Sequence, residues 1–327
     1  MDSSIKRIAV FCSGGDAPGM NAAIRAVVRT ATYNDLHIYG IFRGFEGMIN
    51  GQIERLETQN VGNIIHRGGT ILKTARSEAF RTPEGRRMAY ESLVAQDIDA
   101  CIAIGGNGTF TGAQIFSKEY DIPFVGVPGT IDNDLYGTDY TIGFDTAVNT
   151  AVEAVDRIRD TADSHNRLFF IEVMGRHSGY IALHTGIGSG AGSVLLPERE
   201  TTIQEVIQQL RVGAKRKKLF SLVIVAEGHP LGGAQAIADA VKHEFDYYET
   251  KVAIIGHLQR GGSPTAMDRL LASRLGHAAV EGLLNGQRNV MVGMVNNQIA
   301  FTDFSDAIHK SKDFNPELLH MAEILGL

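Results

Sequence analysis

Two aspartates lie one residue apart in the segment Pro128–Asp134 (PGTIDND), directly after the apolar run Ile122–Val127. Such a run predicts a short buried strand, and open α/β sheets carry their chemistry at the carboxyl ends of their strands. One aspartate there could take a proton from a substrate hydroxyl while the other binds a metal ion or fixes an orientation. The alternative is a turn in which Asp and Asn bond their own backbone. The motif alone leaves these two interpretations about even.

Two glycine-rich segments, Ser13–Asn21 (SGGDAPGMN) and Gly105–Thr109 (GGNGT), each follow a predicted strand and precede a predicted helix. Glycine lets the backbone approach a ligand closely, and the amide groups at the start of the next helix attract anions. Two such loops suit the polyphosphate of a nucleotide, although glycines also serve tight strand-to-helix turns. Neither loop is a Walker A sequence or a dinucleotide-binding fingerprint.

Cationic and polar side chains follow several other predicted strands or turns. Of the two arginines in His66–Ser77, Arg76 is the better candidate for neutralising the oxygens of a phosphoryl group in transfer, the alternative being a solvated surface cation. Met174–His177, Glu227–Gly228 and His257–Gly262 each come after a strand-like run. Together they would form a polar lining suited to a polyhydroxylated, phosphorylated ligand. His257 taken alone would more safely be a hydrogen-bonded structural histidine.

Strand-like runs alternate with helical patterns along the chain, which predicts an α/β fold built from βαβ units on largely parallel sheets. We expect strands at Ile8–Cys12, Cys101–Ile104, Phe124–Val127, Leu168–Val173, Ser221–Ala226 and Val252–Gly256, and helices that begin near Asn21, span Val148–Val155 and span Ile203–Leu210.

With 327 residues the chain is longer than one hydrophobic core usually organises, so two lobes are expected. No low-complexity linker marks a boundary, and we expect chain crossovers between the lobes with a split near Thr141–Gly143. The expected division is 1–142 plus about 258–306 for a larger lobe and 143–257 plus about 307–327 for a smaller one.

Composition excludes several classes of protein. A hydrophobic content of 44% with 21% charged residues does not indicate disorder, and a net charge of −6 gives no general attraction to nucleic acid or to an anionic membrane. No stretch approaches the roughly 20 apolar residues of a membrane span, and the start shows no signal-peptide core. Cys12 and Cys101 both lie in apolar runs, which favours buried free thiols and a cytoplasmic location.

Taken together, these motifs resemble those of the bacterial ATP-dependent 6-phosphofructokinase family (phosphofructokinase A), from the first strand to near the C-terminus. The blocks that carry the resemblance, in the order of the family, are Ser13–Asn21, Arg67–Thr70, Pro128–Asp134, Met174–Arg176 and Gly256–Pro264. The resemblance implies two Rossmann-like three-layer α/β/α lobes with mainly parallel sheets and an active site in the cleft between them. The larger lobe would bind ATP and the smaller one fructose 6-phosphate.

The implied activity is transfer of the γ-phosphoryl group of ATP to the 1-hydroxyl of fructose 6-phosphate with Mg²⁺, giving fructose 1,6-bisphosphate in glycolysis. By the resemblance, Asp132 is the general base, Arg76 stabilises the transferring phosphoryl group, and Thr130 and Arg176 position the substrate. Asp134 would assist by orientation or by contact with the metal. Such a reaction depends mainly on positioning and charge neutralisation.

The resemblance also implies binding roles. The ATP contacts would be Gly15, Arg76, Ser77, Gly106, Asn107, Gly108 and Thr109, and the sugar-phosphate contacts Thr130, Ile131, Asp132, Met174, Gly175, Arg176, Glu227, His257 and Arg260. Arg167 and Lys251 match positions that reach into a neighbouring subunit's site, which implies a homotetramer with shared substrate sites.

Two departures from the family pattern affect the active site. Asn107 stands where the family has an aspartate at Mg²⁺, so one negative charge is missing beside the metal, although an amide oxygen remains. We therefore expect weaker Mg²⁺ binding. Lys251 stands where the family has an arginine on the sugar phosphate, which keeps the charge but loses bidentate geometry.

A further departure concerns regulation. The basic residues Arg25, Arg29, Arg159, Lys215, Lys217 and Lys218 resemble the family's effector site, where ADP activates and phosphoenolpyruvate inhibits. The expected arginine falls at Thr58 and the expected glutamate near Gly192. Allosteric control is therefore expected to be weakened or to use another ligand.

The sequence leaves three alternatives to this activity. Pyrophosphate-dependent members of the family carry an aspartate where this chain has Gly108 and a lysine where it has Gly129, and these glycines favour ATP by leaving room for it. Asn107 raises the possibility of a weakly catalytic, sugar-phosphate-sensing regulatory subunit, although Asp132, Arg76 and Arg176 are retained. A relative of the NAD or lipid kinases would not share the Met-Gly-Arg and Gln-Arg-Gly-Gly blocks.

Overall fold

The computed structural model describes residues 5–164, 167–216 and 221–326. They form two compact units, and the chain passes between them several times. The first unit comprises the residues up to Ile131, Leu135–Asp145 and Arg260–Lys312, and the second comprises Asp132–Asp134, Thr146–Gln259 and the residues from Asp313 onward.

The first unit contains a seven-stranded sheet. Its strands are β1 (Arg7–Cys12), β2 (His37–Ile41), β3 (Ile53–Leu56), β4 (Ala100–Gly105), β5 (Phe124–Pro128), β10 (Val290–Val295) and β11 (Gln298–Asp303). Their order is β11-β10-β5-β4-β1-β2-β3, and only the two edge strands, β3 and β11, pair antiparallel with their neighbours. β4 and β5 are buried along their whole length, as expected for central strands of a sheet covered on both faces.

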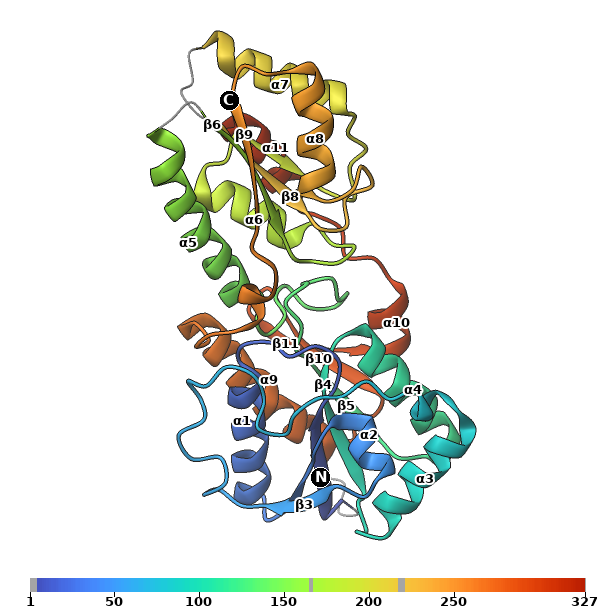
Figure 1. The fold of residues 1–327 in the computed structure, drawn as a ribbon. Helices are drawn as coiled ribbons and strands as arrows, with labels where there is room; N and C mark the ends of the chain where they lie inside the picture. The colour runs from blue at the N-terminus through green and yellow to red at the C-terminus, as the bar shows by residue number, and fades with distance from the viewer. Residues whose placement is uncertain (1–4, 165–166, 217–220, 327) are drawn as a thin grey trace. The chain divides into compact units, whose positions relative to one another are not determined.

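Helices cover both faces of this sheet (Figure 1). They are α1 (Met20–Tyr33), α2 (Gly44–Ile49), α3 (Pro83–Val94), α4 (Asn107–Tyr120), α9 (Ala266–Leu284) and α10 (Phe304–His309), with the short 3₁₀ helix η1 (Ala79–Arg81). α1 and α9 pack against each other, whereas α2, α3, α4 and α10 share a core with β1 and β4. In that core the rings of Phe110 and Phe304 stack with centroids 5.3 Å apart.

The second unit contains a four-stranded parallel sheet with the order β7-β8-β6-β9. Its strands are β6 (Arg167–Val173), β7 (Ser193–Leu195), β8 (Ser221–Ala226) and β9 (Glu249–Ile254), and its helices are α5 (Phe144–Asp163), α6 (Tyr180–Ser189), α7 (Ile203–Lys215), α8 (Ala234–Glu244) and α11 (Pro316–Leu325). α7 and α8 pack on one face through a core of Leu, Ile and Val side chains. η2 (Gly256–Arg260) follows β9 and carries the chain back to the first unit.

The predicted α/β class is confirmed, and five predicted strands lie within one or two residues of β1, β4, β5, β6 and β8. The prediction for the sixth was wrong in its bounds, because β9 runs Glu249–Ile254 and not Val252–Gly256. Gly256 adopts a left-handed conformation (φ +55°) and begins η2, so the strand ends before it. Five strands were not predicted: β2, β3, β7, β10 and β11.

Cys12 and Cys101 are buried free thiols, as predicted. Burial raises the pKa of the Cys12 thiol to about 12 and raises that of Cys101 as well, so both remain neutral and unreactive.

None of the helices in the described parts of the chain has both the length and the apolarity needed to cross a membrane.

Candidate active site

Three glycine-containing loops of the first unit lie at one edge of its sheet. β1, β4 and β5 are neighbours and run parallel, so their carboxyl ends at Cys12, Gly105 and Pro128 lie together. The Thr109 hydroxyl donates a hydrogen bond to the Ser13 carbonyl oxygen (3.2 Å), which ties the first loop to the second. The two loops predicted to bind phosphate, Ser13–Asn21 and Gly105–Thr109, therefore lie side by side.

The second of these loops leads directly into α4. Gly106 is the N-cap of this helix and provides no side-chain cap, and the amino-terminal end of a helix attracts anions. Asn107 is half-buried in the first turn, and Gly108 is exposed with open space around the position of a Cβ atom. This arrangement suits the phosphates of a nucleotide.

Asn21, in the first turn of α1, holds a further glycine-containing loop, Arg67–Ile71, in place. Its side-chain amide donates to the carbonyl oxygens of Arg67 (3.0 Å) and Gly68 (3.2 Å), and its Oδ1 accepts from the backbone N–H of Ile71 (2.8 Å). Asn21 is only 1% exposed. The sequence motif contained Asn21 but did not reveal this role. The signal that could have revealed it is an amide side chain on an otherwise apolar face of the helix.

The predicted phosphoryl-stabilising residue, Arg76, follows this loop and has an exposed side chain. Its neighbour Ser77 accepts a hydrogen bond at Oγ from the backbone N–H of Phe80 (3.2 Å), at the start of η1. Its exposure leaves this cation accessible to an anionic ligand.

Arg260 belongs to the first unit and lies against the first glycine loop. Its Nη1 donates to the carbonyl oxygen of Asp16 (3.2 Å), and a Cβ atom on Gly15 would lie 2.6 Å from that nitrogen. The structure thus brings together Gly15, predicted to contact ATP, and Arg260, predicted to contact the sugar phosphate.

The chain passes from one unit to the other within the paired-aspartate motif. Thr130 and Ile131 belong to the first unit, where the Thr141 hydroxyl donates to the Thr130 carbonyl oxygen (2.6 Å). Asp132 and Asp134 belong to the second, and Asp132 is 6% exposed. The predicted base is therefore a largely buried carboxylate, and Asp134 beside it is half-buried.

The backbone of Asp132 is held by a residue that sequence reasoning missed. The buried Ser178 donates from Oγ to the Asp132 carbonyl oxygen (3.0 Å). Ser178 also donates its backbone N–H to the carbonyl oxygen of Gly175 (2.8 Å), within the predicted sugar-phosphate loop. Ser178, through its side chain and its backbone, thus links the position of the predicted base to that of the loop after β6.

Glu227 fixes the turn that carries Arg176. Its Oε1 accepts from the backbone N–H groups of Gly175 (3.2 Å) and Arg176 (2.7 Å). Arg176 has a left-handed backbone (φ +53°), which costs a non-glycine residue roughly 1–2 kcal/mol. Next to it, a Cβ atom on Gly228 would lie 1.8 Å from the Arg176 carbonyl oxygen, so only glycine fits.

Met174 completes this part of the site. Its backbone N–H donates to Oε1 of the fully buried Gln259 (2.8 Å), which joins the end of β6 to η2. His257 lies in η2 and is exposed. Within the second unit the structure therefore brings Met174, Gly175, Arg176 and Glu227 together.

Arg167 and Lys251 do not join that group. Arg167 is the first residue of β6, and Met174 directly follows the last. Seven strand residues span about 20 Å, so the two ends of β6 cannot serve one small ligand in the same copy of the chain. Both cations instead form ion pairs with Glu249, at 3.0 Å from Arg167 Nε and 2.6 Å from Lys251 Nζ.

The predicted effector residues lie on elements of both units. Arg25 and Arg29 lie on α1 in the first unit, whereas Arg159 on α5 donates to the carbonyl oxygens of Ser189 and Gly190 at the end of α6. Lys215 is the last residue of α7 and is exposed, and Lys217 and Lys218 lie outside the described residues.

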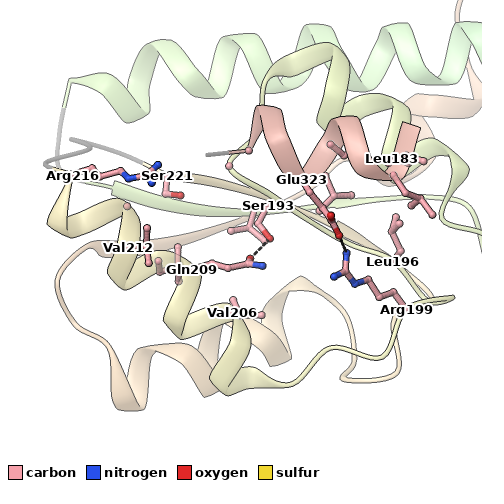
Figure 2. Close-up of a pocket in the computed structure, with 18 residues that line it drawn as sticks. Leu183, Ser193, Leu196, Arg199, Val206, Gln209, Val212, Arg216, Ser221 and Glu323 are labelled. Atoms are coloured by element: carbon pink, nitrogen blue, oxygen red, sulfur yellow. Dashed lines mark hydrogen bonds and ion pairs between the residues drawn. The ribbon is translucent and has the colours of Figure 1, made fainter. Parts of the chain in front are cut away.

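A cavity of about 450 Å³ lies in the second unit between α7, β7, β8 and α11 (Figure 2). Ser193 donates to Gln209 Oε1 (2.8 Å) at its centre, and Arg199 pairs with Glu323 (2.5 Å) at one end. Gly192, where a glutamate was expected, is part of its lining, and none of the predicted catalytic residues is.

Asn107 is the predicted ligand of Mg²⁺. Among the described residues, no three His, Cys, Asp or Glu side chains gather in a way that could bind a metal by themselves. Mg²⁺ at nucleotide sites usually keeps waters and takes one or two protein oxygens besides the substrate phosphates. An amide oxygen at the start of α4 fits an ion of that kind.

Comparison with known proteins identifies the family. The sequence model of the phosphofructokinase family matches residues 7–283. The chain is 55% identical to the ATP-dependent 6-phosphofructokinase of Cytophaga hutchinsonii over 98% of both chains, and 55% identical to ATP-dependent 6-phosphofructokinase 1 of Thermus thermophilus over 99% of this chain and 100% of that one. A solved phosphofructokinase from Saccharomyces cerevisiae superposes with a TM-score of 0.88 at 36% identity, covering 93% of this chain but only 45% of the yeast chain. The chain belongs to the phosphofructokinase family.

The loop that carries Glu227 also contains a buried histidine, His229. His229 is 4% exposed, and its Nδ1 accepts from the backbone N–H of Leu231 (3.2 Å), so the ring is neutral there. Burial lowers the pKa of His229 below its usual value.

We predict that His229 destabilises the fold as the pH falls. Below the usual histidine pKa the unfolded chain takes up a proton that the folded chain does not, so the free energy of unfolding decreases until the lowered pKa is reached. Denaturant unfolding between pH 8 and pH 5 should show a shallower pH dependence for His229→Gln than for the parent. Parallel curves would contradict this prediction.

We also predict that Asn21→Ala destabilises the first unit by about 2–4 kcal/mol, because two carbonyl groups and one N–H group lose a buried partner. Asn50→Ala is the matched control, since Asn50 is the exposed C-cap of α2 and bonds Glu46 in the preceding turn. Denaturant unfolding should separate the two variants. A loss for Asn21→Ala no larger than that of the control would refute the role of Asn21.

Proposed function

We propose that this protein is an ATP-dependent 6-phosphofructokinase, a phosphotransferase of glycolysis that converts fructose 6-phosphate to fructose 1,6-bisphosphate. The observation that carries the proposal is the match, at 55% identity and over nearly the whole length of both chains, to bacterial proteins of that name. The loops at the carboxyl ends of β1, β4 and β5 support it by forming a phosphate-binding edge.

In the proposed reaction Asp132 accepts the proton of the sugar 1-hydroxyl. The hydroxyl oxygen forms a bond to the γ-phosphorus of ATP as the bond from that phosphorus to the bridging oxygen breaks, and ADP leaves with the bonding pair. Arg76 neutralises charge on the transferred group. The burial of Asp132 supports its role, because a base shielded from bulk water keeps its orientation.

The substrate-positioning roles of Thr130 and Arg176 are also part of the proposal. The Glu227 carboxylate accepts a hydrogen bond from the backbone N–H of Arg176 and so fixes the backbone from which the Arg176 side chain extends. Thr130 is anchored at its carbonyl oxygen by Thr141. Met174, Gly175, Glu227 and His257 would contact the sugar phosphate, and Arg260 would lie where it also supports the Gly15 loop.

Bound Mg²⁺ would supply positive charge that offsets the negative charge of the ATP phosphates and of the transferred group. Asn107 would provide an oxygen ligand, and Asp134 would orient the metal or the substrate. Gly15, Ser77, Gly106, Gly108 and Thr109 would surround the nucleotide. The uncapped first turn of α4 supports this placement, since its amide groups favour an anion.

We assign ATP binding to the larger unit and fructose 6-phosphate binding to the smaller one, with Ile131 near their junction in the sequence. Arg167 and Lys251, at the opposite end of β6 from Arg176, support a homotetramer in which they bind the sugar phosphate of a neighbouring copy. The substrates of glycolysis make the cytoplasm the expected location.

ATP as donor is supported by the names of the relatives and by open space at Gly108. Gly129 does not add to this, because a Cβ there would lie 2.9 Å from Ile104 Cγ2 and 3.2 Å from Met20 Cε. Packing alone requires glycine at that position.

Control by ADP or phosphoenolpyruvate is proposed to be weak. Thr58 and Gly192 lack the charges expected for an effector site, and Arg159 bonds the end of α6. Arg25, Arg29 and Lys215 remain as possible contacts for an anionic effector.

We predict that the protein phosphorylates fructose 6-phosphate in the presence of Mg²⁺ when ATP is the donor, and that it does not do so when pyrophosphate is the donor. Asp132→Asn should lower kcat at least about a hundredfold, because the amide cannot accept the proton. Asp121→Asn, an exposed change at the end of α4, should match the parent in a coupled assay. Turnover with pyrophosphate alone would refute the choice of donor, and absence of turnover with either donor would refute the activity.

We also predict that Asn107→Asp lowers the Mg²⁺ concentration needed for half-maximal rate, because a carboxylate attracts the ion more strongly than an amide. The same substitution at the exposed Asn63 is the control for a change in net charge. Mg²⁺ titrations at saturating substrates test this. Coincident curves for Asn107→Asp and the parent would remove Asn107 from the metal site.

A further inference from the structure

Three charged side chains gather at the amino-terminal edge of the second unit's sheet. β6 and β9 pair in parallel, with Arg167 opposite Glu249 and Phe169 opposite Lys251. Since side chains alternate between the faces of a strand, Glu249 and Lys251 lie on the same face, and Arg167 faces Glu249 across the ladder. This edge is the opposite one from that of Arg176 and Glu227.

The Glu249 carboxylate bridges the two cations, using one oxygen for each. Oε1 lies 2.6 Å from Lys251 Nζ and Oε2 lies 3.0 Å from Arg167 Nε. Hydrogen bonds from Lys251 and Arg167 lower the pKa of this carboxyl to about 2, so it is ionised at any physiological pH. Arg167 also donates from Nη1 to Thr161 Oγ1 (3.4 Å).

We propose that Glu249 is an internal competitor for the sugar phosphate: its carboxylate pairs with Arg167 and Lys251 and must release at least one of them when phosphate binds. The proposal rests on the proposed function, which gives these two cations to the phosphate of fructose 6-phosphate. The role of Glu249 goes beyond it, because a carboxylate at that place opposes the ligand.

The competition follows from geometry and charge. A phosphate group would use two of its oxygens to bridge a lysine and an arginine, as Glu249 now does, and the same donor atoms cannot serve both at full strength. The phosphate would also lie beside a fixed negative charge of its own sign. Glu249 thus weakens substrate binding and raises the sugar concentration at which the enzyme responds.

Stability does not explain the carboxylate. The side chains of Glu249 and Lys251 are 51% and 44% exposed, and ion pairs in such positions contribute little to folding. Removing the charge is therefore expected to leave the fold intact, which makes the proposal testable by substitution.

Glu249→Gln keeps the shape of the side chain and removes its charge. We expect the half-saturating concentration of fructose 6-phosphate to fall about tenfold, with kcat and the KM for ATP changed less than twofold. A rise in the half-saturating concentration of fructose 6-phosphate would show that Glu249 instead positions Arg167 and Lys251 for the phosphate. An unchanged half-saturating concentration would show that Glu249 does not compete. Either result overturns the proposal.

Two further variants control for indirect effects. Glu153→Gln removes a carboxylate that pairs with the exposed Arg157 on α5, and should leave the sugar response unchanged. In a Lys251→Gln background, Glu249→Gln should change the half-saturating concentration by much less than tenfold. A full tenfold effect in that background would show that Glu249 does not act through the cation pair.

Calorimetric titration of the intact protein with inorganic phosphate, without ATP, separates this inference from the proposed function. Tighter phosphate binding by Glu249→Gln than by the parent supports the competition even if the parent turns over no sugar phosphate. Equal affinities overturn the competition even if the parent is an active kinase.

Discussion

Parallel strand pairing is the constraint on which the site depends. In each unit the strands that carry site residues run in one direction, so their carboxyl ends, and the loops after them, lie at one edge. In the first unit this gathers three glycine-containing loops, and in the second it gathers Arg176 and Glu227. The same pairing sends Arg167, at the start of β6, to the other edge. The parallel direction of the strands therefore decides which charged groups of a single chain can contact the same ligand.

The loops at these edges hold shapes that their own residues do not favour, and neighbouring side chains support them. Arg176 has a left-handed backbone and is stabilised by two amide hydrogen bonds to Glu227 from its turn. Asn133, between the two aspartates, is also left-handed (φ +52°), a conformation that asparagine tolerates better than most residues. Ser178 bonds the Asp132 carbonyl oxygen beside it. Such supports keep chemically useful side chains in fixed places at a small cost in strain.

How much of this could be predicted depended on whether the signal was local. Central strands such as β4 and β5 are short apolar runs and were predictable, whereas β3 and β11 are edge strands with mixed burial. Chemically distinctive residues after strands were predictable by type. Asn21 and Ser178 were not, because their function is a hydrogen bond to a residue 46 positions away in each case. Gly129 shows the converse, since the sequence suggested room for a ligand where the structure shows packing against Ile104.

Charge, more than shape, distinguishes this chain from the pattern it resembles. At the proposed metal site Asn107 lacks the negative charge of the family's aspartate, and at the proposed phosphate site Lys251 keeps a positive charge but cannot form the paired hydrogen bonds of an arginine. Both changes leave backbone geometry alone, because each residue lies on a regular element, α4 or β9. A charge at the start of a helix or on an exposed strand can change without repacking a core. Binding strength can therefore be adjusted at such positions while the parallel sheets, which fix where the loops meet, stay the same.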